Sequence, residues 1–116
     1  MKKIIAVDDD SGMLDMMELV LKNHFSVRTT TDPEKVLGMI EDDTLLILTD
    51  REMPNLNGFE LARVIKARPN PPKVLMVTGG ATEIDQDEAL KAGIDGFLQK
   101  PFFPKVLIDS INALIS

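Results

Sequence analysis

The chain has 116 residues, of which 44% are hydrophobic and 28% are charged, and its formal net charge at pH 7 is −6. We therefore expect residues 1–116 to form one globular domain that binds neither nucleic acid nor an anionic membrane. The absence of cysteine excludes disulfides, zinc–thiolate sites and thiol catalysis. No apolar run approaches the roughly 20 residues of a membrane helix or forms a signal-peptide core, so we expect a cytoplasmic protein.

The N-terminal segment predicts a strand followed by a helix. Residues 4–7 form a continuous apolar run, which is typical of a strand buried on both faces of a parallel sheet. Three aspartates follow this run, and apolar residues then recur at helical spacing over residues 14–21. We expect Asp10, the last of the three aspartates, to begin the helix, because a carboxylate there suits the N-terminal dipole.

The next segment repeats this order of strand and helix. A weaker strand signal covers residues 25–29, and Asp32 followed by Pro33 predicts a helix start with the aspartate as N-cap. The apolar stripe of this helix extends to Ile40. Residues 45–48 form the second continuous apolar run and predict a second strand buried on both faces.

The third unit is a helix that precedes another buried strand. Residues 57–68 have apolar residues at helical spacing, Val64 among them, and Pro69 ends the helix. Residues 74–77 form the third continuous apolar run. They predict another strand in the interior of the sheet.

The C-terminal part predicts two further helices with a strand between them. Residues 81–92 have helical spacing and end at Gly93, a residue type common just after a helix C-terminus. Residues 96–99 give a weak strand signal, and residues 104–115 again have helical spacing. Five alternating strands and helices predict an α/β fold, with a parallel sheet covered by helices on both faces.

Polar residues follow four of the predicted strands, and the carboxyl ends of parallel strands form the edge at which such sheets bind ligands. The residues at these four ends are Asp8 to Asp10, Thr49 and Asp50, Thr78 to Gly80, and Lys100 with Pro101. Each residue alone is more often a cap, a strand end or a surface charge. Together they predict a phosphoryl-transfer site with an aspartate nucleophile, acidic Mg²⁺ ligands, and a lysine and a threonine that bind phosphoryl oxygens.

Four motifs occur in order along nearly the whole chain: IIAVDDDSG, LLILTDREMPNLNGFEL, KVLMVTGG and DGFLQKPF. With these motifs the chain resembles the receiver domain of two-component response regulators. The resemblance implies a flavodoxin-like (βα)5 fold, a doubly wound five-stranded parallel sheet with strand order 2-1-3-4-5. It also implies a phosphoacceptor switch in phosphorelay signal transduction, which catalyses its own phosphorylation and dephosphorylation but is not a turnover enzyme.

The resemblance further implies how the acidic residues act. Asp50 is similar to the phosphoacceptor of the family. Asp8 and Asp9 are similar to the acidic pair that binds Mg²⁺ or Mn²⁺, together with Asp50 and the backbone carbonyl of Glu52. We expect this ion to be the only cofactor.

The resemblance also implies roles for two residues that contact the phosphoryl group and for one that changes conformation after phosphorylation. Thr78 is similar to the hydroxyl residue, and Lys100 to the lysine, that contact the phosphoryl group. Phe97 is in the position of an aromatic switch residue that rotates inward as Thr78 closes on the phosphate. The bond between Lys100 and Pro101 matches one that is often cis in the family.

The partners implied by the resemblance are a phosphodonor and an output. The donor is a sensor histidine kinase or a histidine phosphotransfer protein. Phosphorylation then changes the surface formed by the predicted helix 81–92, strand 96–99 and helix 104–115. This surface controls an output domain or effector protein, or forms a homodimer.

Parts of the sequence are also compatible with two other function classes. Asp8 and Asp10 followed by Ser11 also fit the D-x-D pattern of haloacid-dehalogenase-like phosphatases, with Asp8 as nucleophile and Asp10 as acid and base. Such enzymes are longer and need a cap and a further acidic motif, which this sequence lacks. A degenerate receiver that only binds a partner is disfavoured because every chemical position is occupied.

The sequence leaves two apolar groups open to alternative interpretations. Met13, Met16 and Met17 either fill gaps in the core or expose a patch that docks a kinase or phosphotransfer helix. Val106 and Ile108 either widen the core contact of the last helix or form a dimer or partner face.

Overall fold

The computed structural model describes residues 1–79 and 86–116, and its centre is a five-stranded sheet. The strands are β1 (Lys3–Val7), β2 (Ser26–Thr30), β3 (Thr44–Asp50), β4 (Lys73–Thr78) and β5 (Gly96–Gln99). Their order is β2-β1-β3-β4-β5, and the four neighbouring pairs are parallel. The predicted α/β fold with strand order 2-1-3-4-5 is confirmed.

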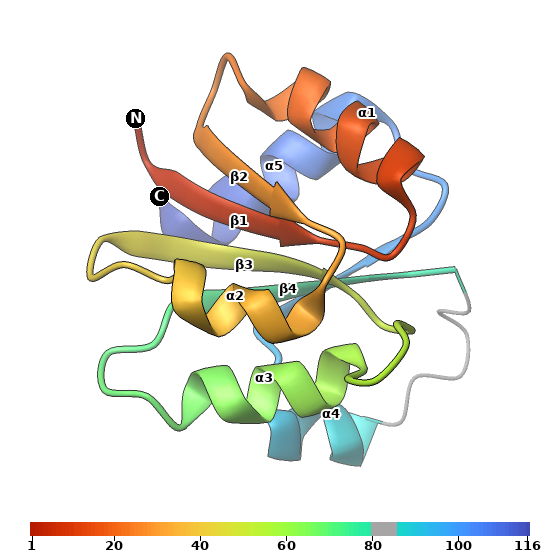
Figure 1. Cartoon of the computed structure of the whole chain (residues 1–116). Coiled ribbons are helices and arrows are strands. Elements are labelled where there is room, and N and C mark those ends of the chain that lie inside the picture. The colour runs from red at the N-terminus through yellow and green to blue at the C-terminus, as the bar shows by residue number, and fades with distance from the viewer. Residues whose placement is uncertain (80–85) are drawn as a thin grey trace.

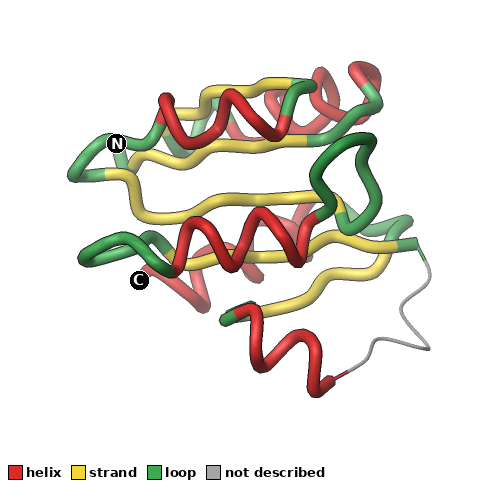
Figure 2. Tube along the Cα trace, turned by 60° about the horizontal axis from the view of Figure 1, so that its bottom comes forward, coloured by secondary structure: helices red, strands yellow, loops and turns green. Residues whose placement is uncertain are grey.

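Five described helices cover the two faces of the sheet. They are α1 (Ser11–Leu21), α2 (Pro33–Met39), α3 (Gly58–Lys66), α4 (Gln86–Ala92) and α5 (Pro104–Ile115). Figures 1 and 2 show α1 and α5 on one face and α2, α3 and α4 on the other. The N- and C-termini lie together at the end of the sheet where β1 begins (Figure 1). Among the described residues, none of the helices has the length and hydrophobicity that a membrane span requires.

The sheet divides the hydrophobic core into two clusters, and β1 contributes to both. Ile4 and Ala6 pack with α1 and α5, whereas Ile5 and Val7 pack with α2, α3 and α4. Successive side chains of a strand point to opposite faces, so a strand covered on both sides has no solvent-facing position. This is why the interior strands appear in the sequence as continuous apolar runs.

Three helices begin at the capping residues that local chemistry favours. The side chain of Asp10 accepts hydrogen bonds from the backbone N–H groups of Gly12 and Met13 at 2.9 and 3.3 Å. Asp32 caps α2 in the same way, and its predicted role is confirmed. Asn57 begins α3 with a capping box, in which the N-cap and the third helical residue satisfy each other's backbone donors.

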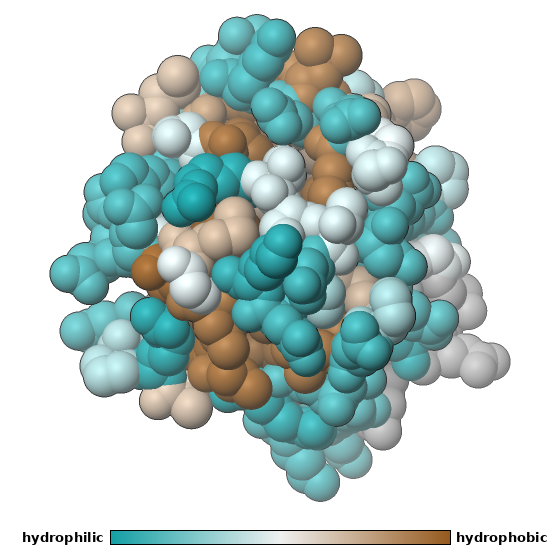
Figure 3. Space-filling model, viewed as in Figure 1, coloured by the Kyte–Doolittle hydropathy of each residue, from teal (hydrophilic) through white to brown (hydrophobic). Residues whose placement is uncertain are grey.

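Two residues that the sequence places in the core are exposed. Leu45 is 36% exposed, because the register of β3 shifts there: Thr44 pairs with Lys3 and Leu46 with Ile4, which leaves Leu45 as an extra residue. Val64 is 43% exposed, because it lies outside the stripe of buried residues with which α3 faces the core. Figure 3 shows hydrophobic residues gathered at the surface near α3, and further hydrophobic residues near α1.

The element boundaries differ from the prediction at several ends. β2 begins at Ser26 rather than at residue 25, and Phe25 is instead a buried core residue. α3 ends at Lys66, before the predicted residue 68. α4 is described from Gln86, and the prediction for residues 81–85 lies outside the described residues. Gly93 follows α4 with a φ of +79°, which confirms its predicted position after the helix C-terminus.

The apolar residues of α1 and α5 mostly pack against the core. Met17 is 2% exposed, and Met13 and Met16 are partly buried against the same cluster, which favours their interpretation as core-filling residues. Ile108 also packs against this cluster. Val106 is 44% exposed and remains at the surface of α5.

Candidate functional site

The carboxyl ends of four strands bring the predicted site residues to one edge of the sheet. Asp8 directly follows β1, Asp50 and Thr78 end β3 and β4, and Lys100 directly follows β5. The register places Thr78 beside Gln99, and the backbone N–H of Lys100 donates to the carbonyl oxygen of Thr78 at 2.9 Å. Residues far apart in the sequence thus converge because the strands are parallel.

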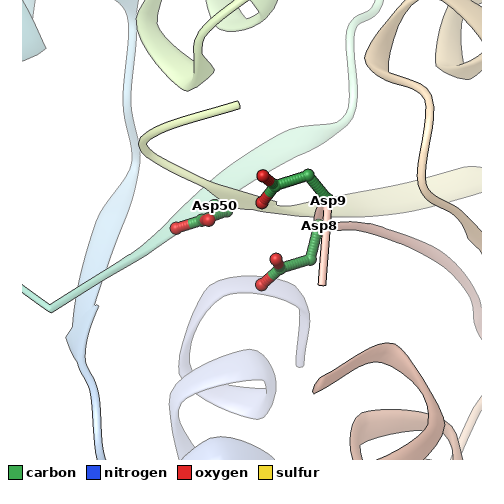
Figure 4. Close-up of side chains that lie close together, drawn as sticks. All are labelled: Asp8, Asp9 and Asp50. Atoms are coloured by element: carbon green, nitrogen blue, oxygen red, sulfur yellow. The ribbon is translucent and has the colours of Figure 1, made fainter. Parts of the chain in front are cut away.

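Three carboxylates form the acidic centre of this edge. Figure 4 shows Asp8, Asp9 and Asp50 grouped where β1 and β3 end. One carboxylate oxygen from each residue lies within 4.8 Å of the others. Asp8 is buried, Asp50 is partly buried and Asp9 is exposed, so the group has one solvent-facing side. Carboxylate oxygens are the ligands that hard divalent cations such as Mg²⁺ prefer, so the donor set fits that ion.

Asp8 has a partner for each of its carboxylate oxygens. One oxygen accepts the backbone N–H of Asp10 at 2.9 Å, and the other accepts the Nζ of Lys100 at 3.0 Å. The side chain of Asp8 is only 1% exposed. A charge at such a buried position is tolerated only when it is paired and hydrogen-bonded, which is the case here.

Lys100 bridges Asp8 and Asp50, the two members of the acidic group that are buried or partly buried. Its Nζ lies 3.0 Å from an oxygen of Asp8 and 3.4 Å from an oxygen of Asp50. Burial disfavours the charged amine, but the hydrogen bond and charge of Asp8, followed by those of Asp50, outweigh burial and raise the pKa of Lys100. The ammonium form of Lys100 is therefore stabilised at this edge.

The surroundings of Asp50, in contrast, disfavour its charged form. Burial raises the pKa of its carboxyl group, and the charge of Asp8 raises this pKa further. Lys100 and the backbone N–H of Arg51, which donates to the Asp50 carboxylate at 2.9 Å, offset only part of this increase. A cation bound among the three carboxylates would favour the ionised form, which is the nucleophilic form of an aspartate.

A cavity of about 310 Å³ opens beside this group. It is lined by Asp50, Arg51, Glu52, Thr78, Gly79 and Lys100. Asp8 and Asp9 are not among its lining residues. The structure therefore gives Asp50 access to a small ligand, with Lys100 and Thr78 on the wall of the same space.

The remaining predicted residues occupy different positions. Glu52 is exposed and lines the cavity. Phe97 lies on β5 beside Met76, is 39% exposed and is not among the cavity-lining residues. The peptide bond between Lys100 and Pro101 is cis, as the resemblance implies.

Sequence reasoning did not single out one cavity-lining residue, Arg51. The available signal was the run TDREMP, in which a cationic residue directly follows the aspartate at the end of β3. The structure places the guanidinium carbon of Arg51 over the ring of Phe59, 5.5 Å from the ring centroid.

Known protein families and curated proteins include sequences that are similar to this chain. A sequence model described as the response regulator receiver domain matches residues 4–112. The transcriptional regulatory protein CpxR of Escherichia coli (strain K12) is 33% identical over 116 residues. The match covers 99% of this chain and 50% of CpxR, so the chain spans about half the length of this curated relative.

Two solved structures are also similar to this chain. A CheY-like response regulator receiver domain protein from Methanospirillum hungatei JF-1 has a TM-score of 0.86 at 33% identity, covering 97% of this chain and 92% of that one. The chemotaxis protein CheY4 of Vibrio cholerae has a TM-score of 0.90 at 26% identity, covering 99% of each chain.

Proposed function

The chain belongs to the response regulator receiver domain family, and we propose that residues 1–116 act as one phosphoacceptor switch with Asp50 as the acceptor. The observation that supports this most strongly is the bridging position of Lys100. Its ammonium group contacts Asp50 and lines the cavity that Asp50 faces, where it can pair with a phosphoryl oxygen. Thr78 lines the same cavity and supplies the hydroxyl group.

The proposed reaction is transfer of one phosphoryl group. A carboxylate oxygen of Asp50 attacks the phosphorus of a partner's phosphohistidine, the phosphorus–nitrogen bond breaks, and the imidazole leaves with the bonding electron pair. The product is an acyl phosphate on Asp50. Asp8, Asp9, Asp50 and the backbone carbonyl of Glu52 would hold Mg²⁺ or Mn²⁺, which neutralises charge on the phosphoryl oxygens when bound. Because the acceptor is the protein itself, the domain is a switch and not a turnover enzyme.

The output of the switch is proposed to be the surface formed by α4, β5 and α5. Each of these elements exposes a large hydrophobic side chain: Leu90 of α4 is 81%, Phe97 of β5 39% and Val106 of α5 44% exposed. Contacts of Thr78 with the phosphoryl group would shift the population between two states, and Phe97 would turn inward in one of them. This surface would then bind an effector protein, an output domain or a second copy of the chain in the cytoplasm.

The phosphatase alternative receives no support from the geometry. Its nucleophile would be Asp8, but Asp8 is buried, holds the amine of Lys100 and does not line the cavity. A sensor histidine kinase or histidine phosphotransfer protein remains the proposed donor.

The proposal is tested by intact-mass spectrometry after incubation with a small acyl phosphate and Mg²⁺. We expect the native protein to gain one phosphoryl group and Asp50→Asn to gain none. Asp109→Asn, which removes an exposed carboxylate of α5, is the matched control and should be labelled like the native protein. Labelling of Asp50→Asn to the native extent would show that another residue is the acceptor.

A further inference from the structure

The backbone of Arg51 is fixed tightly beside the acceptor. Its N–H donates to the carbonyl oxygen of Val77 at 3.1 Å and to the Asp50 carboxylate at 2.9 Å. Its carbonyl oxygen accepts the N–H of Gly58 at 2.8 Å. The starting point of the Arg51 side chain is therefore set by β3, β4 and the first residue of α3.

The side chain of Arg51 is also held by packing. Its guanidinium carbon lies 5.5 Å from the centroid of the Phe59 ring, and Phe59 is only 3% exposed. A guanidinium stacked on an aromatic face keeps its in-plane N–H donors available. Arg51 is also one of the residues that line the cavity beside Asp50.

The charge of Arg51 is not neutralised in the way that the charge of Lys100 is. Within residues 1–79 and 86–116, no carboxylate oxygen lies within 4.0 Å of a guanidinium nitrogen of Arg51. Lys100, which also lines the cavity, is already paired with Asp8 and Asp50. An anion that approaches Asp50 through the cavity therefore meets Arg51 as a cation that no described carboxylate neutralises.

From this arrangement we propose that Arg51 binds the phosphoryl group of small acyl phosphate donors and sets the preference of the site for dianionic donors. The proposal rests on the function proposed above. A guanidinium matches the planar pairs of oxygens of a phosphoryl group and forms charge-assisted hydrogen bonds with them. This contact counters the repulsion that Glu52 and the cluster of Asp8, Asp9 and Asp50 exert on an incoming dianion.

The reaction that Arg51 would assist is balanced without a further reactant. A carboxylate oxygen of Asp50 attacks the phosphorus of the acyl phosphate, and the bond between phosphorus and the acyl oxygen breaks. The acyl group leaves as a carboxylate with the bonding electrons, and the phosphoryl group stays on Asp50. Arg51 donates hydrogen bonds to phosphoryl oxygens and transfers no proton.

The test measures the second-order rate constant for phosphorylation of the full chain in Mg²⁺ by intact mass, with two donors. Acetyl phosphate is a dianion at neutral pH, and phosphoramidate carries less net negative charge. We expect Arg51→Met to slow labelling by acetyl phosphate about fivefold and labelling by phosphoramidate by less than about twofold. Arg51→Lys keeps the charge without the planar fork and should give an intermediate rate. Added salt should reduce the difference between the rate constants of the native protein and Arg51→Met with acetyl phosphate.

Arg63→Met is the matched control, because Arg63 is an exposed arginine of α3 that does not line the cavity. Its rates with both donors should equal those of the native protein. Native rates for Arg51→Met, or equal slowing with both donors, would overturn the role of Arg51, since equal slowing indicates a merely structural effect. If the native protein is not labelled at Asp50 by either donor, the proposed function itself fails.

Discussion

At the scale of single residues, the site depends on how its charges are balanced. Asp8 and Asp50 are both partly or fully withdrawn from water, and the amine of Lys100 lies 3.0 and 3.4 Å from their oxygens. Without a cation, ionised Asp50 sits in an environment that disfavours its charge, because burial and Asp8 together outweigh Lys100. The ionised carboxylate of Asp50 therefore lowers the stability of the metal-free fold, and this effect can be measured.

The first prediction concerns the pH dependence of stability in Asp50→Asn without metal. The pKa of Asp50 in the folded protein is raised above 3.8, its ordinary value, which we take for the unfolded chain. Between the unfolded and the folded pKa, the native state therefore binds more protons than the unfolded state. Stability of the unmodified protein is then lost as pH rises through the interval between these two pKa values. Asp50→Asn should be more stable than the unmodified protein at neutral pH, and its advantage should shrink as pH falls toward 3.8.

Urea unfolding at a series of pH values, with a chelator present, measures this difference. An advantage of Asp50→Asn that is constant with pH, or that grows on acidification, would contradict the cause given for the raised pKa.

Much of the site was predictable from the sequence, because the carboxyl ends of parallel strands must meet. That argument placed Asp50, Thr78 and Lys100 at one edge without any structural information. It could not predict that Asp8 is buried while Asp9 is exposed, because this depends on which way each side chain points after β1 ends. It also could not predict the packing of Arg51 on Phe59, which requires a side-chain conformation and a helix in a known place.

At the scale of elements, the start of α3 is packed directly against the end of β3. Gly58 is the first residue of α3, and a Cβ built on it would lie 2.5 Å from the carbonyl oxygen of Asp50 and 2.7 Å from the Cε of Met76. The carbonyl oxygen of Asp50 belongs to the backbone, so it cannot move aside as the end of a flexible side chain can. The contact requires glycine, and it keeps the loop after Asp50 close to the helix.

The second prediction compares two glycine-to-alanine changes. Gly58→Ala should lower the free energy of unfolding by about 2 kcal/mol or more, because the added methyl group overlaps backbone. Gly38→Ala is the matched control, since Gly38 lies in α2 and, beyond its chain neighbours and the adjacent backbone of its own helix, no atom lies within 4 Å of the built Cβ. It should raise the free energy of unfolding by about 0.5 kcal/mol, because alanine favours the helix. Urea unfolding of both variants measures the two changes, and equal effects would refute the steric explanation.

The existence and order of the elements were predicted more accurately than their ends. Continuous apolar runs identified the interior strands because both faces are covered. The exposed position of Leu45 was missed, since a one-residue shift between β1 and β3 leaves no mark in the apolar run. Helix ends depend on caps, and those with a clear cap residue, such as Asp10 and Asp32, were placed correctly.

At the scale of the whole molecule, the acidic group connects the ends of β1 and β3 across the centre of the sheet. Repulsion among its carboxylates lowers stability, and a divalent cation would remove that repulsion. Any ion that binds the folded but not the unfolded chain raises stability by mass action. Metal binding should therefore be visible in the unfolding of the entire protein.

The third prediction is that millimolar Mg²⁺ raises the melting temperature of the native protein by about 5 °C. Asp9→Asn should melt at a higher temperature than the native protein without metal, because it removes one repelling charge. It should lose most of the Mg²⁺ shift and should not be phosphorylated. Asp15→Asn, an exposed aspartate of α1, is the control and should keep the full shift. Equal Mg²⁺ shifts in native protein and Asp9→Asn would place the ion elsewhere.

The central claim is that phosphoryl transfer occurs on Asp50, and peptide mapping by mass spectrometry after labelling with acetyl phosphate tests it most directly. The account predicts one phosphoryl group, located on Asp50, when Mg²⁺ is present and none when a chelator replaces it. A phosphoryl group on Asp8 would instead support the phosphatase chemistry, and labelling unaffected by the chelator would contradict the role of the acidic group.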